Sequence, residues 1–229
     1  HYTYGLSIIN THLFSKSKII VNENSFFEKD FWTKFNKYNV SSFGAVSFMY
    51  EILKKIKFEK MNCNNLKYIT HAGGKLDKNL HNYILKLCKI QKLKFITMYG
   101  QTEATSRISY LPYKFSNKKI SSIGRAIPGG KMYIKGDKYK GEICYEGKNI
   151  MNGYALNKDD LRIKQNIKTL YTGDYGWRDK DGFFYIQGRK DRFIKYLGNR
   201  INLDEIDALL KEHGFHTVTK YSKNYFTKK

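Results

Sequence analysis

Residues 66–103, LKYITHAGGKLDKNLHNYILKLCKIQKLKFITMYGQTE, decide the fold class. Two short runs within them, 66–70 and 94–98, are rich in β-branched and aromatic residues and have the length of buried strands. Between these runs, apolar residues recur at helical spacing and form one stripe: Leu76, Leu80, Tyr83, Ile84 and Leu87. Strand, helix and strand in this order predict parallel strands with a helix packed on their sheet.

The same alternation extends towards the amino terminus. It predicts further strands at 18–21 and 40–43, and helices at 26–38, 47–58 and 76–89. We therefore expect residues 1–115 to form an α/β region, in which helices flank a mostly parallel sheet.

Beyond residue 116 the pattern changes, because glycines interrupt short strand-like runs. Strands are expected at 120–130, 131–135, 141–145 and 169–171. Asp181-Gly182 is expected to supply the positive φ angles of a tight hairpin turn. These features predict an antiparallel β subdomain over 116–190.

A third pattern begins at residue 191. Asn202 is a candidate helix N-cap with Glu205 three residues later, and Gly214 is a candidate helix stop. We expect residues 191–229 to begin a small, mobile α+β domain.

The composition restricts the classes of protein. The formal charge is +22, but the lysines are spread along the whole chain, which does not favour a specific nucleic-acid partner. A basic surface also suits the polyanions ATP and CoA. A basic nucleic-acid-binding module remains an alternative. No apolar run approaches the ~18 residues that a membrane-spanning helix needs, so no membrane association is expected.

The cysteines indicate the compartment. Cys63, Cys88 and Cys144 are odd in number, far apart and without metal-ligand spacing, which argues against a disulfide framework or a zinc site. A reducing, cytoplasmic location is expected.

Two segments at predicted strand ends carry residues suited to nucleotide chemistry. They are HAGGK at 71–75 and MYGQTEA at 98–104. Ligands bind at the carboxyl ends of strands in open α/β sheets. Glycines there let the backbone approach a flat ring, Tyr99 can stack on it, the Thr102 hydroxyl can bond phosphate and Glu103 can hold Mg²⁺. An ordinary strand-to-helix turn with a threonine cap is the alternative interpretation.

A second group of residues lies further along the chain. In LYTGD at 170–174, Asp174 sits in a glycine turn, where a carboxylate can accept both hydroxyls of a ribose. Arg189 can meet ribose or phosphate oxygens. Taken alone, the two residues would be a turn former and a surface cation.

Four motifs then occur in a fixed order: YGQTE from residue 99, GEICYEGKNIMNGY from 141, YTGD from 171 and GRKDRFIKYLGNRINLDEI from 188. In this order they resemble the signature motifs of the adenylate-forming (AMP-binding) superfamily, which includes acyl-CoA synthetases, amino-acid adenylation domains and luciferase. The first residues, HYTYGL, resemble the H-x-x-x-G-L stretch of that superfamily, which introduces the acid pocket.

The resemblance implies a function for each matching residue. Gly73, Gly74, Tyr99 and Gly100 would bind the adenine, Thr102 the α-phosphate, Glu103 the Mg²⁺ ion, and Asp174 with Arg189 the ribose. Thr102, Glu103 and Arg189 would be the catalytic residues, Asp191 would be a hinge, and Gly198 would lie in a loop that faces the thiol acceptor.

The implied reaction has two steps. A carboxylate attacks the α-phosphate of ATP to give an acyl-adenylate, and a thiol of CoA or of a carrier-protein phosphopantetheine then takes the acyl group. Enzymes that stop at the adenylate or oxidise it, as luciferases do, are an alternative. The small-molecule acid is not identified, because we see no fixed charge at 43–48 or 106–111 that would demand a second polar group.

Two parts of the superfamily pattern do not occur within the 229 residues. They are a phosphate loop that would precede HYTYGL and a late lysine of the carboxyl-terminal domain. The resemblance therefore implies a partial chain that does not turn over alone, and a non-catalytic nucleotide-binding fragment remains an alternative.

Overall fold

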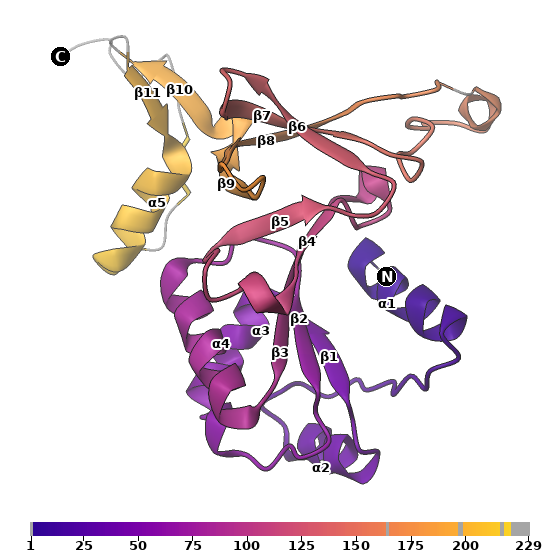
Figure 1. Ribbon diagram of the computed structural model, residues 1–229, viewed down its shortest axis with the longest axis vertical. Coiled ribbons are helices and arrows are strands. Elements are labelled where there is room, and N and C mark those ends of the chain that lie inside the picture. Colours follow the sequence, from indigo (N-terminus) through magenta and orange to yellow (C-terminus); the bar gives the residue numbers. More distant parts are fainter. Residues whose placement is uncertain (1, 164, 197–198, 216–217, 221–229) are drawn as a thin grey trace.

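The computed structural model describes residues 2–163, 165–196, 199–215 and 218–220. These residues form a nine-stranded sheet with helices, followed by a small unit of two strands and one helix (Figure 1). The order of strands across the large sheet is β1-β2-β3-β4-β5-β9-β8-β7-β6.

The elements of the large unit have the following bounds. The strands are β1 (Ser42–Ala45), β2 (Tyr68–His71), β3 (Lys94–Tyr99), β4 (Ser109–Leu111), β5 (Ser122–Ala126), β6 (Lys131–Gly136), β7 (Lys140–Glu146), β8 (Leu170–Arg178) and β9 (Phe184–Arg189). The α-helices are α1 (Thr3–Phe14), α2 (Lys29–Lys37), α3 (Ser47–Lys55) and α4 (Lys78–Gln91). Short 3₁₀ turns are η1 (Phe58–Lys60), η2 (Thr102–Ala104), η3 (Tyr113–Phe115), η4 (Asp159–Arg162) and η5 (Lys190–Arg192).

The parallel part of the sheet confirms the α/β prediction. β1 pairs with β2 and β2 with β3, both in parallel, and the intervening helices are α3 and α4. Because side chains alternate along a strand, Ile69 and Phe95 share one face of the sheet, where they join Ile84 of α4 in a buried core. The expected helical stripe is therefore the face that α4 presents to this sheet.

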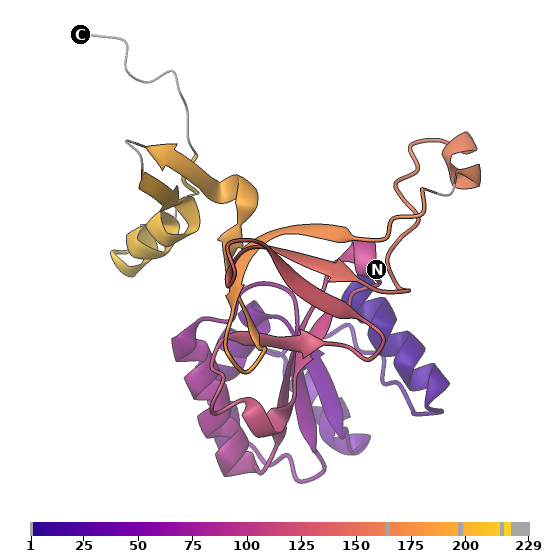
Figure 2. The same ribbon diagram turned by 45° about the horizontal axis from the view of Figure 1, so that its top comes forward.

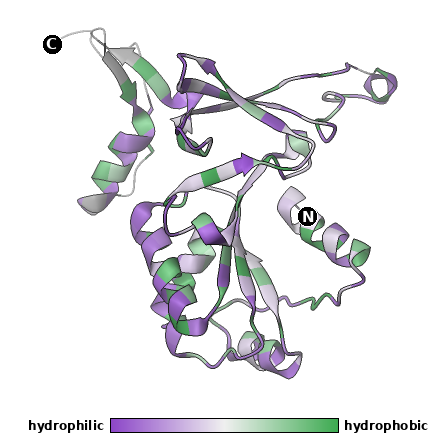
Figure 3. Ribbon diagram, viewed as in Figure 1, coloured by the Kyte–Doolittle hydropathy of each residue, from purple (hydrophilic) through white to green (hydrophobic). Residues whose placement is uncertain are grey.

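The opposite face of the same strands is covered by α1. The hydroxyl of Tyr4 in α1 lies 2.7 Å from that of Thr70 in β2. Gly44 in β1 permits this approach, because a Cβ atom there would lie 2.5 Å from the Tyr4 Oη. Figures 1 and 2 show α1 on the side of the sheet away from α4, and Figure 3 shows its hydrophobic residues.

From β3 onwards the sheet is antiparallel. This was expected for residues 116–190, but β4, which pairs antiparallel with β3, lies within the first region, where no strand was predicted at this place. β3–β4, β4–β5, β5–β9, β9–β8, β8–β7 and β7–β6 all pair antiparallel, and a second core forms around Ile143 and Tyr145. The β8–β9 hairpin differs in detail from the prediction. Gly182 has a φ of 80°, but Asp181 keeps a negative φ, since the turn closes from Asp179 to Gly182.

Some element predictions were wrong. Residues 18–21 form no strand, and Val21 is 83% exposed, because no neighbouring strand offers hydrogen bonds to this β-branched run. The helix expected from residue 26 begins at Lys29, because the Glu28 carboxylate accepts a hydrogen bond from the Ser25 amide and holds a loop there. The sequence patterns also did not predict α1.

The carboxyl-terminal unit contains β10 (Phe193–Tyr196), β11 (Asn199–Asn202) and α5 (Leu203–Glu212). Asn202 caps α5 as predicted, since its Oδ1 accepts from the Asp204 amide at 3.0 Å. Gly214, with a φ of 87°, follows the end of the helix. Throughout the part of the chain that the structure describes, every helix is too short or too polar to cross a bilayer.

Candidate functional site

Three residues that are distant in sequence meet where β3 ends beside β8 and β9. The Tyr99 hydroxyl donates to Asp174 Oδ2 at 2.5 Å. Asp174 lies opposite Arg189 in the β8–β9 pairing, and Arg189 Nη1 is 3.3 Å from Asp174 Oδ1. The same nitrogen donates to the Thr172 carbonyl at 2.9 Å. The structure thus brings together the predicted residues of the YGQTE, YTGD and GRKD motifs.

The electrostatics of this group are unusual for residues that only form turns. Burial raises the pKa of Asp174 above its ordinary value, and the hydrogen bond from Tyr99 and the charge of Arg189 only partly offset it. Burial, together with the Asp174 charge, raises the pKa of Tyr99 well above its usual range. Buried groups with perturbed pKa values and specific partners are typical of functional sites.

Two glycines make the geometry possible. Gly173 has a φ of 70°, which favours glycine, and a Cβ atom there would lie 2.8 Å from Arg189 Nη2, so the guanidinium would have to shift from its place across the turn. At Gly100 a Cβ atom would lie 2.1 Å from the Ser106 carbonyl oxygen. Glycine at this position therefore allows residues 100–107 to fold back on themselves.

The loop after β2 contains the predicted Gly73 and Gly74, with φ angles of 74° and 85°. It is held by His71, whose Nε2 lies 2.9 Å from the Ser47 hydroxyl, and Ser47 in turn donates to the Lys75 carbonyl. Burial lowers the pKa of His71 to about 4, so the ring is neutral and carries its proton on Nε2 in this arrangement. Ser47 was not predicted as a site residue, because its position at the start of α3 gives no separate signal in the sequence.

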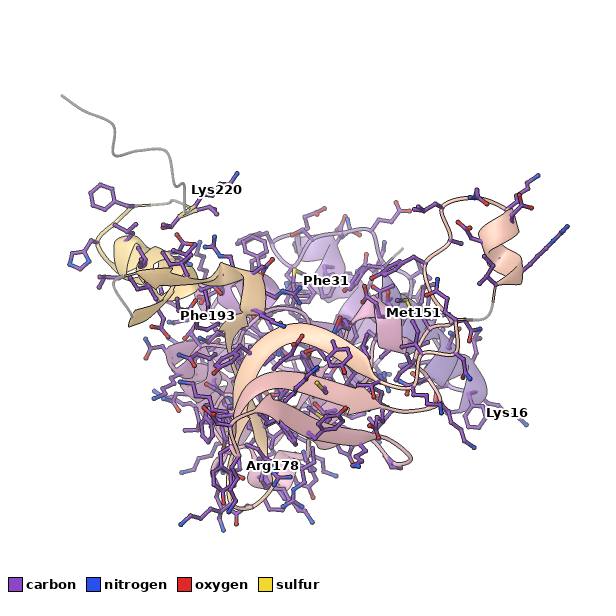
Figure 4. The ribbon with its side chains drawn as sticks, turned by 90° about the horizontal axis from the view of Figure 1, so that it is seen from above. Lys16, Phe31, Met151, Arg178, Phe193 and Lys220 are labelled. Carbon is purple, nitrogen blue, oxygen red and sulfur yellow. The ribbon has the colours of Figure 1, made fainter. Side chains whose placement is uncertain are left out.

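Thr102 and Glu103 lie in η2 and contact other elements. The Thr102 hydroxyl is 2.9 Å from that of Thr3 in α1. Glu103 Oε1 accepts from the Tyr154 hydroxyl, and its carbonyl accepts from the Met151 amide at 2.8 Å. Both partners belong to the loop 147–169, which projects from the sheet in Figure 1 and begins near the labelled Met151 in Figure 4. Gln101 links η2 to the first group, since its Nε2 lies 3.4 Å from the Thr172 carbonyl.

The junction around Asp191 is anchored on both sides. Lys190 Nζ lies 2.7 Å from Glu142 Oε2 of β7. Arg192 Nε lies 2.8 Å from Asp204 Oδ1 of α5. The Asp191 side chain between them is 77% exposed. Adjacent residues therefore hold two different units, which is compatible with a pivot at Asp191. Gly198 lies outside the described residues.

A cavity of about 1150 Å³ lies on the α1 side of the sheet. Its walls include Thr70, Ile96 and Met98 from the strands, Ile8 from α1, and Arg107, which follows η2. Arg107 overturns the expectation that residues 106–111 bring no fixed charge to this region.

No group of three or more His, Cys, Asp or Glu side chains that could hold a metal occurs among the described residues. Mg²⁺ is usually bound by one or two carboxylates together with substrate phosphates, so the single carboxylate of Glu103 fits this ion when a nucleotide is bound. Cys63, Cys88 and Cys144 are free and buried.

Comparisons with known proteins identify the family and the fold. Residues 1–155 match the family model described as AMP-binding enzyme. The 2-succinylbenzoate–CoA ligase of Listeria monocytogenes is 29% identical over 91% of this chain and 43% of its own length. The luciferin 4-monooxygenase of Luciola mingrelica is 28% identical over 85% of this chain and 36% of its own.

A solved structure is also similar. The unliganded O-succinylbenzoate coenzyme A synthetase of Bacillus subtilis has a TM-score of 0.76 and 25% identity, and the match covers 93% of this chain and 46% of that one. The chain spans less than half the length of these three proteins.

Proposed function

Because the chain belongs to the AMP-binding enzyme family, we propose that it carries the nucleotide and acid sites of an ATP-dependent acid–thiol ligase. A carboxylate attacks the α-phosphate of ATP and displaces pyrophosphate, and the acyl group of the adenylate then passes to a thiol. The observation that carries the proposal is the Tyr99–Asp174–Arg189 group, which presents a largely buried carboxylate directly after Gly173, a residue with a positive φ.

The nucleotide binds with its ribose hydroxyls on Asp174. Each carboxylate oxygen can accept two hydrogen bonds, so Asp174 has room for both hydroxyls beside Tyr99 and Arg189. Tyr99 as a whole residue is only 9% exposed. Only the exposed part of its ring therefore contacts the adenine. The Tyr99 hydroxyl holds Asp174 through its hydrogen bond. Gly73, Gly74 and Gly100 let the backbone approach the base.

The phosphates lie towards η2. The Thr102 hydroxyl bonds the α-phosphate, and Glu103 holds Mg²⁺, which would neutralise phosphate charge. Arg189 supplies a further positive charge near the nucleotide. Tyr154 bonds one oxygen of Glu103, which leaves the second oxygen as a ligand.

The acid lies in the cavity on the α1 side. Thr70 and Met98 form part of its wall, and they directly precede His71 and Tyr99 in the nucleotide region. The cavity therefore reaches the strand ends at which the nucleotide binds, as the attack on the α-phosphate requires.

The thiol step uses a different orientation of the carboxyl-terminal unit. We propose the division of the chain at residues 115 and 190 as domain boundaries, with Asp191 as the hinge and Gly198 facing the acceptor after rotation. The similarity to 2-succinylbenzoate–CoA ligase favours CoA over a carrier protein. The three free, buried cysteines are compatible with the proposed cytoplasmic location.

Pyrophosphate exchange tests the proposal. The protein expressed from its complete coding sequence is incubated with ATP, Mg²⁺ and a panel of carboxylic acids, with Asp174→Asn as the control. We expect acid-dependent exchange that the substitution reduces strongly. ATP binding without exchange for any acid would instead indicate a non-catalytic nucleotide-binding protein, and exchange without thioester formation from CoA would favour the luciferase-like alternative.

A further inference from the structure

We propose that Arg107 selects acids that carry a second anionic group, remote from the carboxylate that is activated. This inference rests on the proposed function, because it takes the cavity on the α1 side of the sheet as the acid site.

The first observation concerns the Nε atom of the Arg107 side chain. Its Nε atom is buried and has no hydrogen-bond partner within the described part of the chain. Buried polar groups in native proteins are normally hydrogen-bonded, and an exception calls for an explanation. A ligand oxygen is the simplest partner, because Nε is one of the two neighbouring donors with which arginine grips a carboxylate.

The second observation is the charge of the cavity. Its described lining contains the cations Arg107 and Lys18 and no aspartate or glutamate. Apolar residues such as Ile96, Met98 and Phe35 make up much of the remaining wall. An anionic group in such surroundings is attracted more strongly to a guanidinium than it would be in water, since the effective dielectric constant is lower.

The third observation separates this charge from the reacting end of the acid. Thr102, Glu103 and Asp174, which we assign to the nucleotide, are absent from the described cavity wall. The backbone of Arg107 is fixed, because its carbonyl accepts from Asn149 Nδ2 at 3.0 Å. The part of an acid that Arg107 meets therefore lies within the cavity, whose described wall does not include these three residues.

The size of the cavity fits such a substrate. Binding sites for small molecules usually have volumes of roughly 300–1000 Å³. At about 1150 Å³ the cavity accommodates an acid with several carbons between its two anionic groups.

Equilibrium binding tests the inference with two pairs of probes that share a carbon skeleton: adipate against hexanoate, and terephthalate against benzoate. The titrations use the protein from its complete coding sequence, saturated with AMP. The variants are Arg107→Gln, Arg107→Lys and, as a matched control for charge, Lys29→Gln, whose exposed side chain lies outside the described cavity wall. AMP affinity and the melting temperature are recorded for each.

We expect the unsubstituted protein to prefer at least one dicarboxylate over its monocarboxylate partner. Arg107→Gln should weaken the binding of that dicarboxylate by about 10- to 100-fold. It should weaken the binding of the monocarboxylate by less than about 2-fold. Arg107→Lys should recover part of the loss, and Lys29→Gln should have little effect.

Several results would overturn the inference. Equal loss for both members of a pair would place Arg107 at the reacting carboxylate, and a loss of AMP affinity would place it at the nucleotide. The absence of dicarboxylate preference in the unsubstituted protein would leave no second anionic subsite. Failure of the proposed function is distinguishable, because it would appear as absent AMP binding whatever the acid results.

Discussion

Asp174 and Asp179 lie five residues apart and offer a matched pair of substitutions. Asp174 accepts from Tyr99 and Arg189, and burial raises its pKa, so the fold disfavours its charge. For Asp179, burial alone would raise the pKa, but the hydrogen bonds from Lys119 and the Phe183 amide outweigh burial and lower it. We therefore expect Asp174 to serve binding and Asp179 to serve stability.

The expected magnitude for Asp174→Asn follows from its contacts. Asparagine can direct its oxygen to Arg189 and its amide to the Tyr99 oxygen, so the local structure is retained. It loses the charge that two ribose hydroxyls would bond, which is worth about 2–3 kcal/mol, or about 30- to 150-fold in Kd. Asp179→Asn should leave nucleotide affinity unchanged and lower the melting temperature, because Lys119 then keeps only Asp181 of its two carboxylate partners.

Calorimetric titration with AMP and thermal melts at two pH values check both variants. A raised folded-state pKa means that an ionised Asp174 costs stability as the pH rises. The melting temperature of Asp174→Asn, taken relative to that of the unsubstituted protein, should therefore be higher at pH 7 than at pH 4. If Asp174→Asn binds AMP normally but melts at a lower temperature, as expected of Asp179→Asn, then Asp174 is only a turn residue and the site assignment fails.

Three further predictions concern other parts of the chain. Glu103→Gln should remove most of the Mg²⁺ dependence of ATP binding while AMP affinity stays unchanged, and titrations with and without Mg²⁺ measure this; retained dependence would exclude Glu103 as the ligand. Asp191→Pro should impair thioester formation from preformed acyl-adenylate more than pyrophosphate exchange, since proline fixes φ near −65°; equal losses would argue against a hinge. His71 and His81 are neutral in the fold, because burial lowers the pKa of each to about 4. The free energy of unfolding should thus fall as the pH drops from about 6.5 towards 4, by about 3 kcal/mol per histidine; denaturant unfolding of His81→Gln should show a smaller fall, and an unchanged fall would refute this cause.

Periodic burial explains which elements the sequence predicts correctly. The stripe of α4 has one buried face, and β2 and β3 are paired on both sides, so pattern and structure agree. Residues 18–21 carry the same β-branched signal without a partner strand, and pairing is a tertiary property that composition does not contain. The chain around α1 shows little amphipathic contrast, because one side faces the cavity and the other exposes Leu13 and Phe14.

The residues of the candidate site also fall into those that the sequence predicts and those that it does not. Tyr99, Asp174 and Arg189 were predicted from motif order, and the structure adds that they touch one another. Ser47, Tyr154 and the cavity charge of Arg107 were not predicted, since each depends on which loop folds against which strand end. Local patterns carry no information on such long-range contacts.

A crystal structure of the protein with bound AMP tests the central claim most directly. We predict ribose hydroxyls on the Asp174 carboxylate, the adenine beside Gly73 and Gly74, and the phosphate towards Thr102. AMP in the smaller, lysine-lined pocket formed by Lys135, Lys140 and Lys190, with Asp174 free of contact, would contradict the account.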